Sequence, residues 1–238
     1  MTTRELSPQA AAREELSRRL ERIVRINVRP IASPLPYGFL GLAVATIVVA
    51  ALNLGWIPAT QGDVVAFALL AFVVPLQATA SVFGTLGRDG VAATGMAILT
   101  GTWATFGLAL LTSPPGSTTN AVGVVLIVSA ISMLVVSLAA ALGKLVPAAV
   151  LFGASLRFAT AAIYQLTASH TWEQITGWVG VALGALAIYA AAATLIEGMQ
   201  GKTVLPLGRH AKGRQAEEGG LTEQLIDLTH EPGVRVQL

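Results

Sequence analysis

The chain has 238 residues, of which 54% are hydrophobic and only 12% are charged, and this composition excludes an ordinary soluble globular domain. No cysteine is present, which excludes disulfides, thiolate catalysis and cysteine metal sites. The formal net charge of +2 would suggest acidic partners in a soluble protein. Here the positions of the basic residues explain that charge as membrane topology.

Long runs without charge predict six membrane-spanning helices. A helix needs about 20 apolar residues to cross the hydrocarbon core of a bilayer. The run 90–143 holds two such helices, because Ser113-Pro114-Pro115-Gly116-Ser117 cannot continue a helix and marks a turn. The fold class expected is an all-α membrane protein whose six helices surround a central pathway. The expected spans lie near 38–58, 64–86, 91–112, 120–143, 145–168 and 174–197.

The basic residues outside the spans predict the orientation of the chain. Fourteen of the 15 Lys and Arg residues lie before the first span, at Arg88 and Lys144, or after the sixth span. The alternate connections 59–63, 113–119 and 169–173 contain neither Lys nor Arg. Because cytoplasmic segments carry the excess of basic residues, we expect both termini in the cytoplasm and the chain in the plasma (inner) membrane.

Composition divides the chain into three segments. Residues 1–29 are basic, with apolar residues at helical spacing, and form either an amphipathic helix on lipid headgroups or a solvated tail. Residues 30–208 form the six-helix transmembrane domain, and residues 209–238 form a polar cytoplasmic tail.

A proline-rich segment precedes the first span. Pro30, Pro34 and Pro36 favour an extended approach to the membrane, and Gly38 permits a tight entry into the helix. Such a backbone either lines a cavity or marks the start of a helix.

Two other spans contain residues that break the apolar pattern. Pro75 is expected to kink the second span, and Gln77 either bonds to another helix or lines a pathway. In the sixth span, Gly180 and Gly184 form a face of small residues, which favours close helix packing or an oligomer interface.

A single charge, Arg157, lies near the middle of the fifth span. A guanidinium at mid-bilayer is costly, so it normally faces the bundle interior or a wet cavity. The functional hypothesis is that Arg157 faces the pathway and pairs with a carboxylate. The structural alternative is that carbonyl groups, Gln77 or Tyr164 hold it, or that it lies between protomers.

Two stretches of the chain resemble the acetate uptake transporters, also called the succinate–acetate permease family. The segment from Gly177 to Tyr189, followed by Gly201-Lys202-Thr203-Val204-Leu205-Pro206-Leu207-Gly208, resembles the C-terminal span of that family. Ser33-Pro34-Leu35-Pro36-Tyr37-Gly38-Phe39 keeps both prolines and the glycine of its N-terminal signature, Asn-Pro-Ala-Pro-Leu-Gly-Leu. The resemblance spans residues 30–210. It implies a six-helix protomer with its own pathway, a homohexamer, and movement of small monocarboxylates such as acetate, channel-like or coupled to protons.

The resemblance also implies which residues line the pathway. Its narrow aromatic ring corresponds here to Leu42, Leu99 and Ala154, while Ser33 replaces the signature asparagine and Arg157 is a gain. A wider ring with a fixed cation suits a larger or different carboxylate, or means that acetate transport has been lost. The candidate pathway residues are Ser33, Pro34, Pro36, Gly38, Leu42, Gln77, Leu99, Ala154 and Arg157.

Two other functions stay open. The first is a channel for a neutral solute (an amide, ammonia or a protonated acid), gated by dewetting at Leu42 and Leu99. The second is a membrane scaffold that does not transport. An enzyme is not expected, because the span interiors hold no charge except Arg157 and all three histidines lie outside them. No cofactor, metal or nucleic acid is expected. The expected partners are a small carboxylate substrate, the lipid bilayer and further copies of the chain.

Overall fold

The structure is a computed structural model that describes Glu15, residues 32–200 and residues 203–208. The expected amphipathic helix of residues 1–29 and the expected polar tail of residues 209–238 lie, except for Glu15, outside the described residues.

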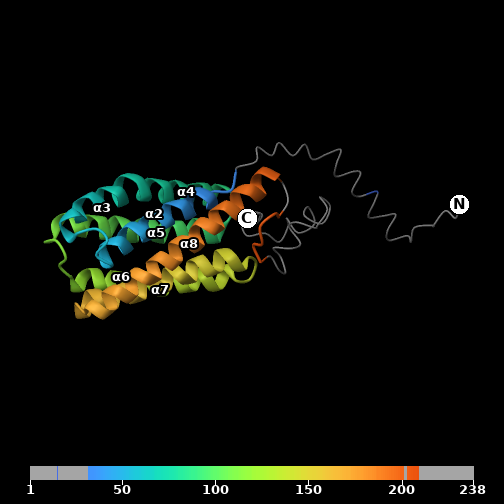
Figure 1. Ribbon diagram of the computed structural model, residues 1–238. Helices are drawn as coiled ribbons and strands as arrows, with labels where there is room; N and C mark the ends of the chain where they lie inside the picture. The colour runs from blue at the N-terminus through green and yellow to red at the C-terminus, as the bar shows by residue number, and fades with distance from the viewer. Residues whose placement is uncertain (1–14, 16–31, 201–202, 209–238) are drawn as a thin grey trace, which may run out of the picture. The chain divides into compact units, whose positions relative to one another are not determined.

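Within the described residues, six helices are long and apolar enough to cross a membrane. Figure 1 shows them as a bundle, and the all-α fold of six spans is confirmed. The second span, Ala59–Leu86, consists of the 3₁₀ turn η1 (Ala59–Gln61), α3 (Gly62–Ala68), the π-helical turn η2 (Leu69–Val73) and α4 (Val74–Leu86). The other spans are α2 (Leu35–Asn53), α5 (Gly90–Thr112), α6 (Asn120–Ala140), α7 (Leu145–Thr167) and α8 (His170–Gln200).

The first span begins earlier than expected, and the prediction of an extended chain at Pro34 and Pro36 was wrong. Pro34 has helical angles (φ −78°, ψ −11°) and directly precedes Leu35, so the prolines start the helix. Proline suits the first turn of a helix because the first amide groups there have no partner within the helix. Gly38 therefore lies inside α2, where a Cβ atom would stand 2.8 Å from the sulfur of Met96. Its role is a close approach between α2 and α5.

Pro75 sits directly after a widened turn in the second span. The amide of Val74 donates to the carbonyl of Leu69, five residues earlier, which is the π-helical spacing. Pro75 has no amide hydrogen, so a regular helix would lose a hydrogen bond at this position. The structure places the irregularity expected at Pro75 in the preceding turn, Leu69–Val73.

The boundaries of two later spans also differ from the expected ones. Helix α6 ends at Ala140, because the amides of Gly143 and Lys144 both donate to its carbonyl (3.1 and 3.0 Å) and close a turn. Helix α8 begins at His170 instead of near residue 174. Ala168 adopts a left-handed conformation (φ 50°), so the chain reverses between α7 and α8 within two residues.

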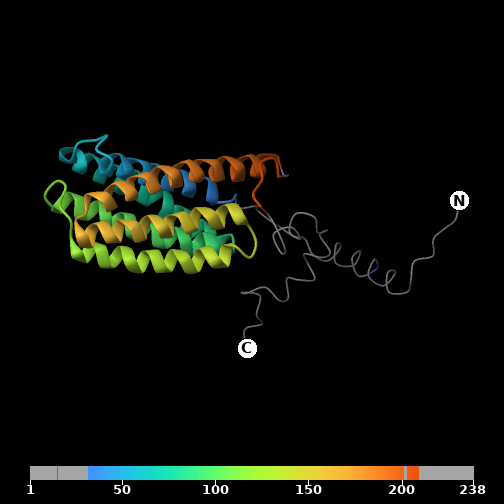
Figure 2. The ribbon, with the colours of Figure 1, turned by 60° about the horizontal axis from the view of Figure 1, so that its bottom comes forward.

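The helices pack as three antiparallel pairs, α2 with α8, α4 with α5, and α6 with α7. Figures 1 and 2 both show α2 beside α8 and α6 beside α7. The small residues of α8 make the first pair possible. A Cβ atom on Gly184 would overlap the side chain of Ile47, and one on Gly180 would stand 3.0 Å from the Cβ of Ala50. The small-residue face is thus used for close packing within one chain.

Residues 203–208 attach to the start of α7. The amides of Leu145 and Val146 donate to the carbonyls of Gly208 and Leu207 (both 3.1 Å), and Leu207 is buried. These amides belong to the first turn of α7 and have no partner within the helix. The segment that resembles the C-terminal family pattern therefore caps a membrane span.

One face of α6 is apolar and exposed. Its members recur at helical spacing and are 56–63% exposed: Val124, Val128, Ile131, Val135 and Leu138. Such a face suits contact with lipid chains. Trp56, which follows the end of α2, and Trp178, two turns into α8, lie edge to face with centroids 5.9 Å apart, and both are 58% exposed. Tryptophan is enriched at membrane–water boundaries.

Candidate functional site

Three helices run in the same direction and present one register of residues to the bundle interior. These are α2, α5 and α7; we call the end where they begin the proximal end and the end where they finish the distal end. Leu42, Leu99 and Ala154 lie one on each helix, 57 and 55 positions apart, and Thr46, Trp103 and Phe158 each follow one of them by four residues, about one helical turn. All six side chains are buried. The ring contact between Trp103 and Phe158 places these positions of α5 and α7 at one height in the bundle.

A hollow of about 180 Å³ opens at the proximal end. Its wall is mostly apolar, with Asp89 and Lys144 as the charged residues that line it. The carboxylate of Asp89 accepts a hydrogen bond from the amide of Ala92 (2.9 Å) and caps α5. On the three parallel helices the hollow reaches as far as Phe39, Met96 and Leu151.

A larger hollow of about 330 Å³ lies at the distal end and is more polar. Asp63 and Glu173 contribute carboxylates to its wall, and Tyr164 and Gln165 contribute further polar groups. On the parallel helices its wall begins at Val49 of α2, Phe106 of α5 and Tyr164 of α7. The two hollows thus approach each other along the same three helices.

Between the hollows lies a buried layer, which we call the plug: Leu42, Thr46, Leu99, Trp103, Ala154 and Phe158. The two hollows are ten helical steps apart on α2, from Phe39 to Val49, and also on α5, from Met96 to Phe106. At 1.5 Å per residue the plug is about 15 Å thick. The structure is therefore closed between two hollows.

The ring predicted from the family resemblance falls within this plug. Leu42, Leu99 and Ala154 are fully buried members of one apolar cluster. Gln77 of α4 is also fully buried and lies beside α2, with its Cγ 3.4 Å from the Cβ position of Gly41. Within the described residues, neither the amide nitrogen nor the oxygen of Gln77 has a hydrogen-bond partner.

The residues of the N-terminal signature lie at the proximal end, away from the plug. Ser33 is exposed, and its hydroxyl accepts a weak hydrogen bond from the amide of Leu35 (3.4 Å). Pro34 and Pro36 are buried on either side of Leu35, which lines the proximal hollow. Gly38 contacts Met96, which lines the same hollow.

Arg157 is brought against α8 and α2 and lines neither hollow. Its side chain is only 2% exposed, so it lies inside the single chain. Its Nε atom stands 2.9 Å from the Cβ position of Gly180. Gln77 and Tyr164, the side chains expected to hold it, do not: Tyr164 donates instead to Glu173 (3.1 Å).

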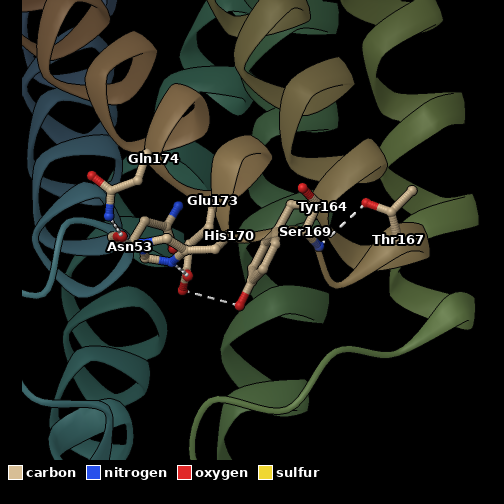
Figure 3. A network of polar contacts seen from close by, with 7 residues as sticks. All are labelled: Asn53, Tyr164, Thr167, Ser169, His170, Glu173 and Gln174. Carbon is tan, nitrogen blue, oxygen red and sulfur yellow. Dashed lines mark hydrogen bonds and ion pairs between the residues drawn. The ribbon is translucent and has the colours of Figure 1, made fainter.

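A polar network links α7, α8 and α2 at the distal end (Figure 3). Glu173 accepts a hydrogen bond from the hydroxyl of Tyr164 and pairs with the Nδ1 atom of His170, both at 3.1 Å. Gln174 donates to the carbonyl of Asn53 (3.2 Å) and so ties α8 to the end of α2. No cluster of three or more metal-ligating side chains occurs among the residues that the structure describes.

Sequence reasoning missed Trp103, Phe158 and Thr46 as members of the plug. The signal that could have found them is helical spacing, because each follows Leu42, Leu99 or Ala154 by four residues and so lies one turn further along the same helix face. It also did not predict that two carboxylates share the distal hollow. Asp63 and Glu173 are far apart in sequence, and only the fold brings both into the lining of that hollow.

The bundle, the two hollows and the plug define a six-span membrane protein with a closed layer between two openings. The chain is similar to the solved structure of the bacterial acetate channel SatP, with a TM-score of 0.67 and 23% identity. The match covers 74% of this chain and 99% of that one. It confirms the predicted resemblance at the level of the fold. No protein-family model and no curated protein matches the sequence.

Proposed function

We propose that the chain is a membrane channel or transporter for small monocarboxylates of the size of acetate. The observation that carries the proposal is the pair of hollows on the same three helices, separated by a plug about 15 Å thick. The similarity in fold to an acetate channel supports the same solute class.

The plug supplies a physical basis for gating. Leu42, Leu99, Ala154 and Phe158 are buried members of one apolar cluster, and an apolar constriction excludes water and ions until it widens. Ala154 leaves the ring wider than a larger side chain would. Small side-chain movements at this layer would join the two hollows into one pathway.

The proposal includes an orientation and an assembly. The proximal connections contain Arg88 and Lys144, whereas the distal connections contain no basic residue, which supports a cytoplasmic proximal end in the plasma membrane. Exposed apolar faces such as that of α6 offer surface for lipid or for further copies of the chain. A homohexamer is the assembly that the resemblance implies.

Uptake of labelled acetate into proteoliposomes tests the proposal. Purified full-length protein is assayed at two pH values, with propionate, succinate and urea as competitors. We expect saturable uptake that propionate inhibits and urea does not. Leu99→Ala in the plug is expected to change the rate, whereas the same truncation at the exposed Leu138 is not. If the folded protein shows no uptake above that of empty vesicles, the transport proposal is contradicted. The chain would then share only the fold of a channel, as expected for a membrane scaffold that does not transport.

One observation favours a second candidate, a channel for neutral solutes. Asp63 and Glu173 place two carboxylates in the wall of the distal hollow, and these repel an entering anion. A protonated acid or an amide would not be repelled. Uptake of acetamide at the rate of acetate, with no current across the membrane, would support this candidate over the first.

A further inference from the structure

We infer that Arg157 forms a binding site for a carboxylate anion inside the membrane domain, at the junction of α2, α7 and α8. The inference deepens the proposed function and rests on it for the identity of the anion, a small monocarboxylate. It assigns a specific group to hold the charged end of that solute beside the plug.

The first argument is the burial of an unpaired charge. Arg157 is 2% exposed, and its Nε and Nη2 atoms have no hydrogen-bond partner within the described residues. A buried charge without a partner is strongly unfavourable, so buried guanidinium groups are paired with an anion or with several acceptors. The site is therefore electrostatically complete only with an anion in contact with these two atoms.

The second argument is the shape of the free donors. Nε and Nη2 donate from the same edge of the planar guanidinium, and that edge matches both oxygens of a carboxylate in a bidentate pair. A halide offers one atom to both donors, whereas a carboxylate gives each donor its own oxygen. The pair of unpartnered atoms therefore favours a planar, two-oxygen anion.

Among residues 32–200, the helical domain supplies no carboxylate at this depth. From residue 64 to residue 172 the one acidic residue is Asp89, which precedes α5 at the proximal end. Arg157 lies twelve residues into α7, or about 18 Å from that end along the helix. Glu173 follows α7 at the distal end, where it bonds to Tyr164 and His170. Since no carboxylate of the described residues reaches Arg157, we assign its counter-charge to a solute.

The surroundings of Arg157 form a built pocket for the guanidinium. The position that a Cβ atom of Gly180 would take lies 2.9 Å from Nε of Arg157, 3.0 Å from the Cβ of Ala50 and 3.1 Å from the carbonyl oxygen of Thr46. Because Gly180 has no side chain, the guanidinium can occupy this space. The hydroxyl of Thr46 donates to the carbonyl of Gly180 (3.1 Å) and fixes α2 against α8. Thr46 also belongs to the plug, so the site adjoins the layer between the hollows.

A second unpartnered donor lies on the same face of α8. Thr176 is fully buried one turn before Gly180, about 6 Å along the helix axis. Thr100, Thr105 and Thr194 each donate to the carbonyl one turn earlier (2.7, 2.9 and 2.8 Å). The hydroxyl of Thr176 has no partner among the described residues. It is available to bind the anion or a water that solvates it.

Binding measurements on the purified full-length protein in detergent test the inference without requiring transport. Acetate and its neutral analogue acetamide are titrated by saturation-transfer NMR. Arg157→Gln removes the charge, and Arg157→Lys keeps the charge but removes the two-donor edge. Gly180→Ala keeps Arg157 but places a methyl group 2.9 Å from Nε. Gly101→Ala is the matched control, because no atom lies within 4 Å of its Cβ position.

We expect wild type and Gly101→Ala to bind acetate at least about tenfold more tightly than acetamide, the ratio that one charge-assisted hydrogen bond supplies. Arg157→Gln should abolish this preference, and Arg157→Lys and Gly180→Ala should each reduce it. If Arg157→Gln does not fold, the preference for acetate over acetamide in Arg157→Lys and Gly180→Ala decides. Acetate binding that is absent in wild type, or unchanged in the variants, overturns the inference. Intact acetate binding without uptake in proteoliposomes would contradict the proposed function alone.

Discussion

The indole ring of Trp103 lies edge-on against the phenyl ring of Phe158, with centroids 5.5 Å apart and ring planes at 64°. The contact joins α5 to α7 inside the plug, one turn beyond Leu99 and Ala154. Aromatic pairs of this geometry are more favourable than their buried area alone. This pair therefore stabilises the packing of α5 against α7 within the plug.

Trp103→Ala should loosen the plug. Removing a buried tryptophan leaves a cavity and is expected to lower stability by about 3 kcal/mol. The widened layer should raise propionate uptake relative to acetate uptake. Thermal unfolding in detergent and paired uptake assays measure both effects. Trp178→Ala, at a site that is 58% exposed, is the control. An unchanged propionate-to-acetate ratio in folded Trp103→Ala would place the pathway elsewhere.

Ala154→Leu should close the plug further. Ala154 is fully buried, so the larger side chain adds volume to a packed layer. We expect acetate uptake to fall by about tenfold or more, the factor that 1.4 kcal/mol added to the barrier produces. The same substitution at the exposed Ala185 of α8 should leave uptake unchanged. Equal uptake by both folded variants would show that solute does not pass Ala154.

Glu173→Gln should increase the entry of acetate anions from the distal side. The substitution removes a negative charge from the wall of the distal hollow. Initial uptake of acetate at neutral pH should rise by about twofold at low ionic strength and converge with wild type at high salt, because salt screens the charge. Glu173→Asp, which keeps the charge, is the control. A rise that salt does not diminish would point to lost hydrogen bonds instead.

Gly184→Ala should separate α8 from α2. The new methyl group would overlap the side chain of Ile47, and relieving this overlap is expected to cost about 1–3 kcal/mol of stability. Ile47→Ala removes the obstructing atoms, so the double variant should be more stable than the sum of the single effects. Midpoints of thermal unfolding report the coupling. Strict additivity would mean that the two residues do not meet in the membrane-embedded protein.

The number, order and approximate bounds of the six spans could be predicted because each run of apolar residues is long enough to cross a bilayer. The start of α2 could not, since a proline-rich stretch fits both an extended segment and a first helical turn. The irregularity near Pro75 was placed within one turn of its observed position at Leu69–Val73.

The site was less accessible to sequence reasoning than the fold. Spans that are apolar on most sides give no periodic signal for the face that points inward. Leu42, Leu99 and Ala154 were therefore found through a family resemblance. The contact of Arg157 with Gly180 depends on how α7 packs against α8 and α2, and nothing local to residue 157 encodes it.

The shared register of α2, α5 and α7 has a consequence for the symmetry of the protein's interior. The position that Arg157 holds on α7 corresponds to Thr102 on α5 and Ala45 on α2, by the same intervals of 55 and 57 residues. Thr102 donates to Ser129 of the neighbouring α6 (2.8 Å), and Ala45 is apolar. Three equivalent positions thus carry a cation, a hydroxyl and a methyl group. The interior of the bundle is therefore threefold in the spacing of its residues but not in its charge, and the electric field of Arg157 is strongest beside α7, α8 and α2.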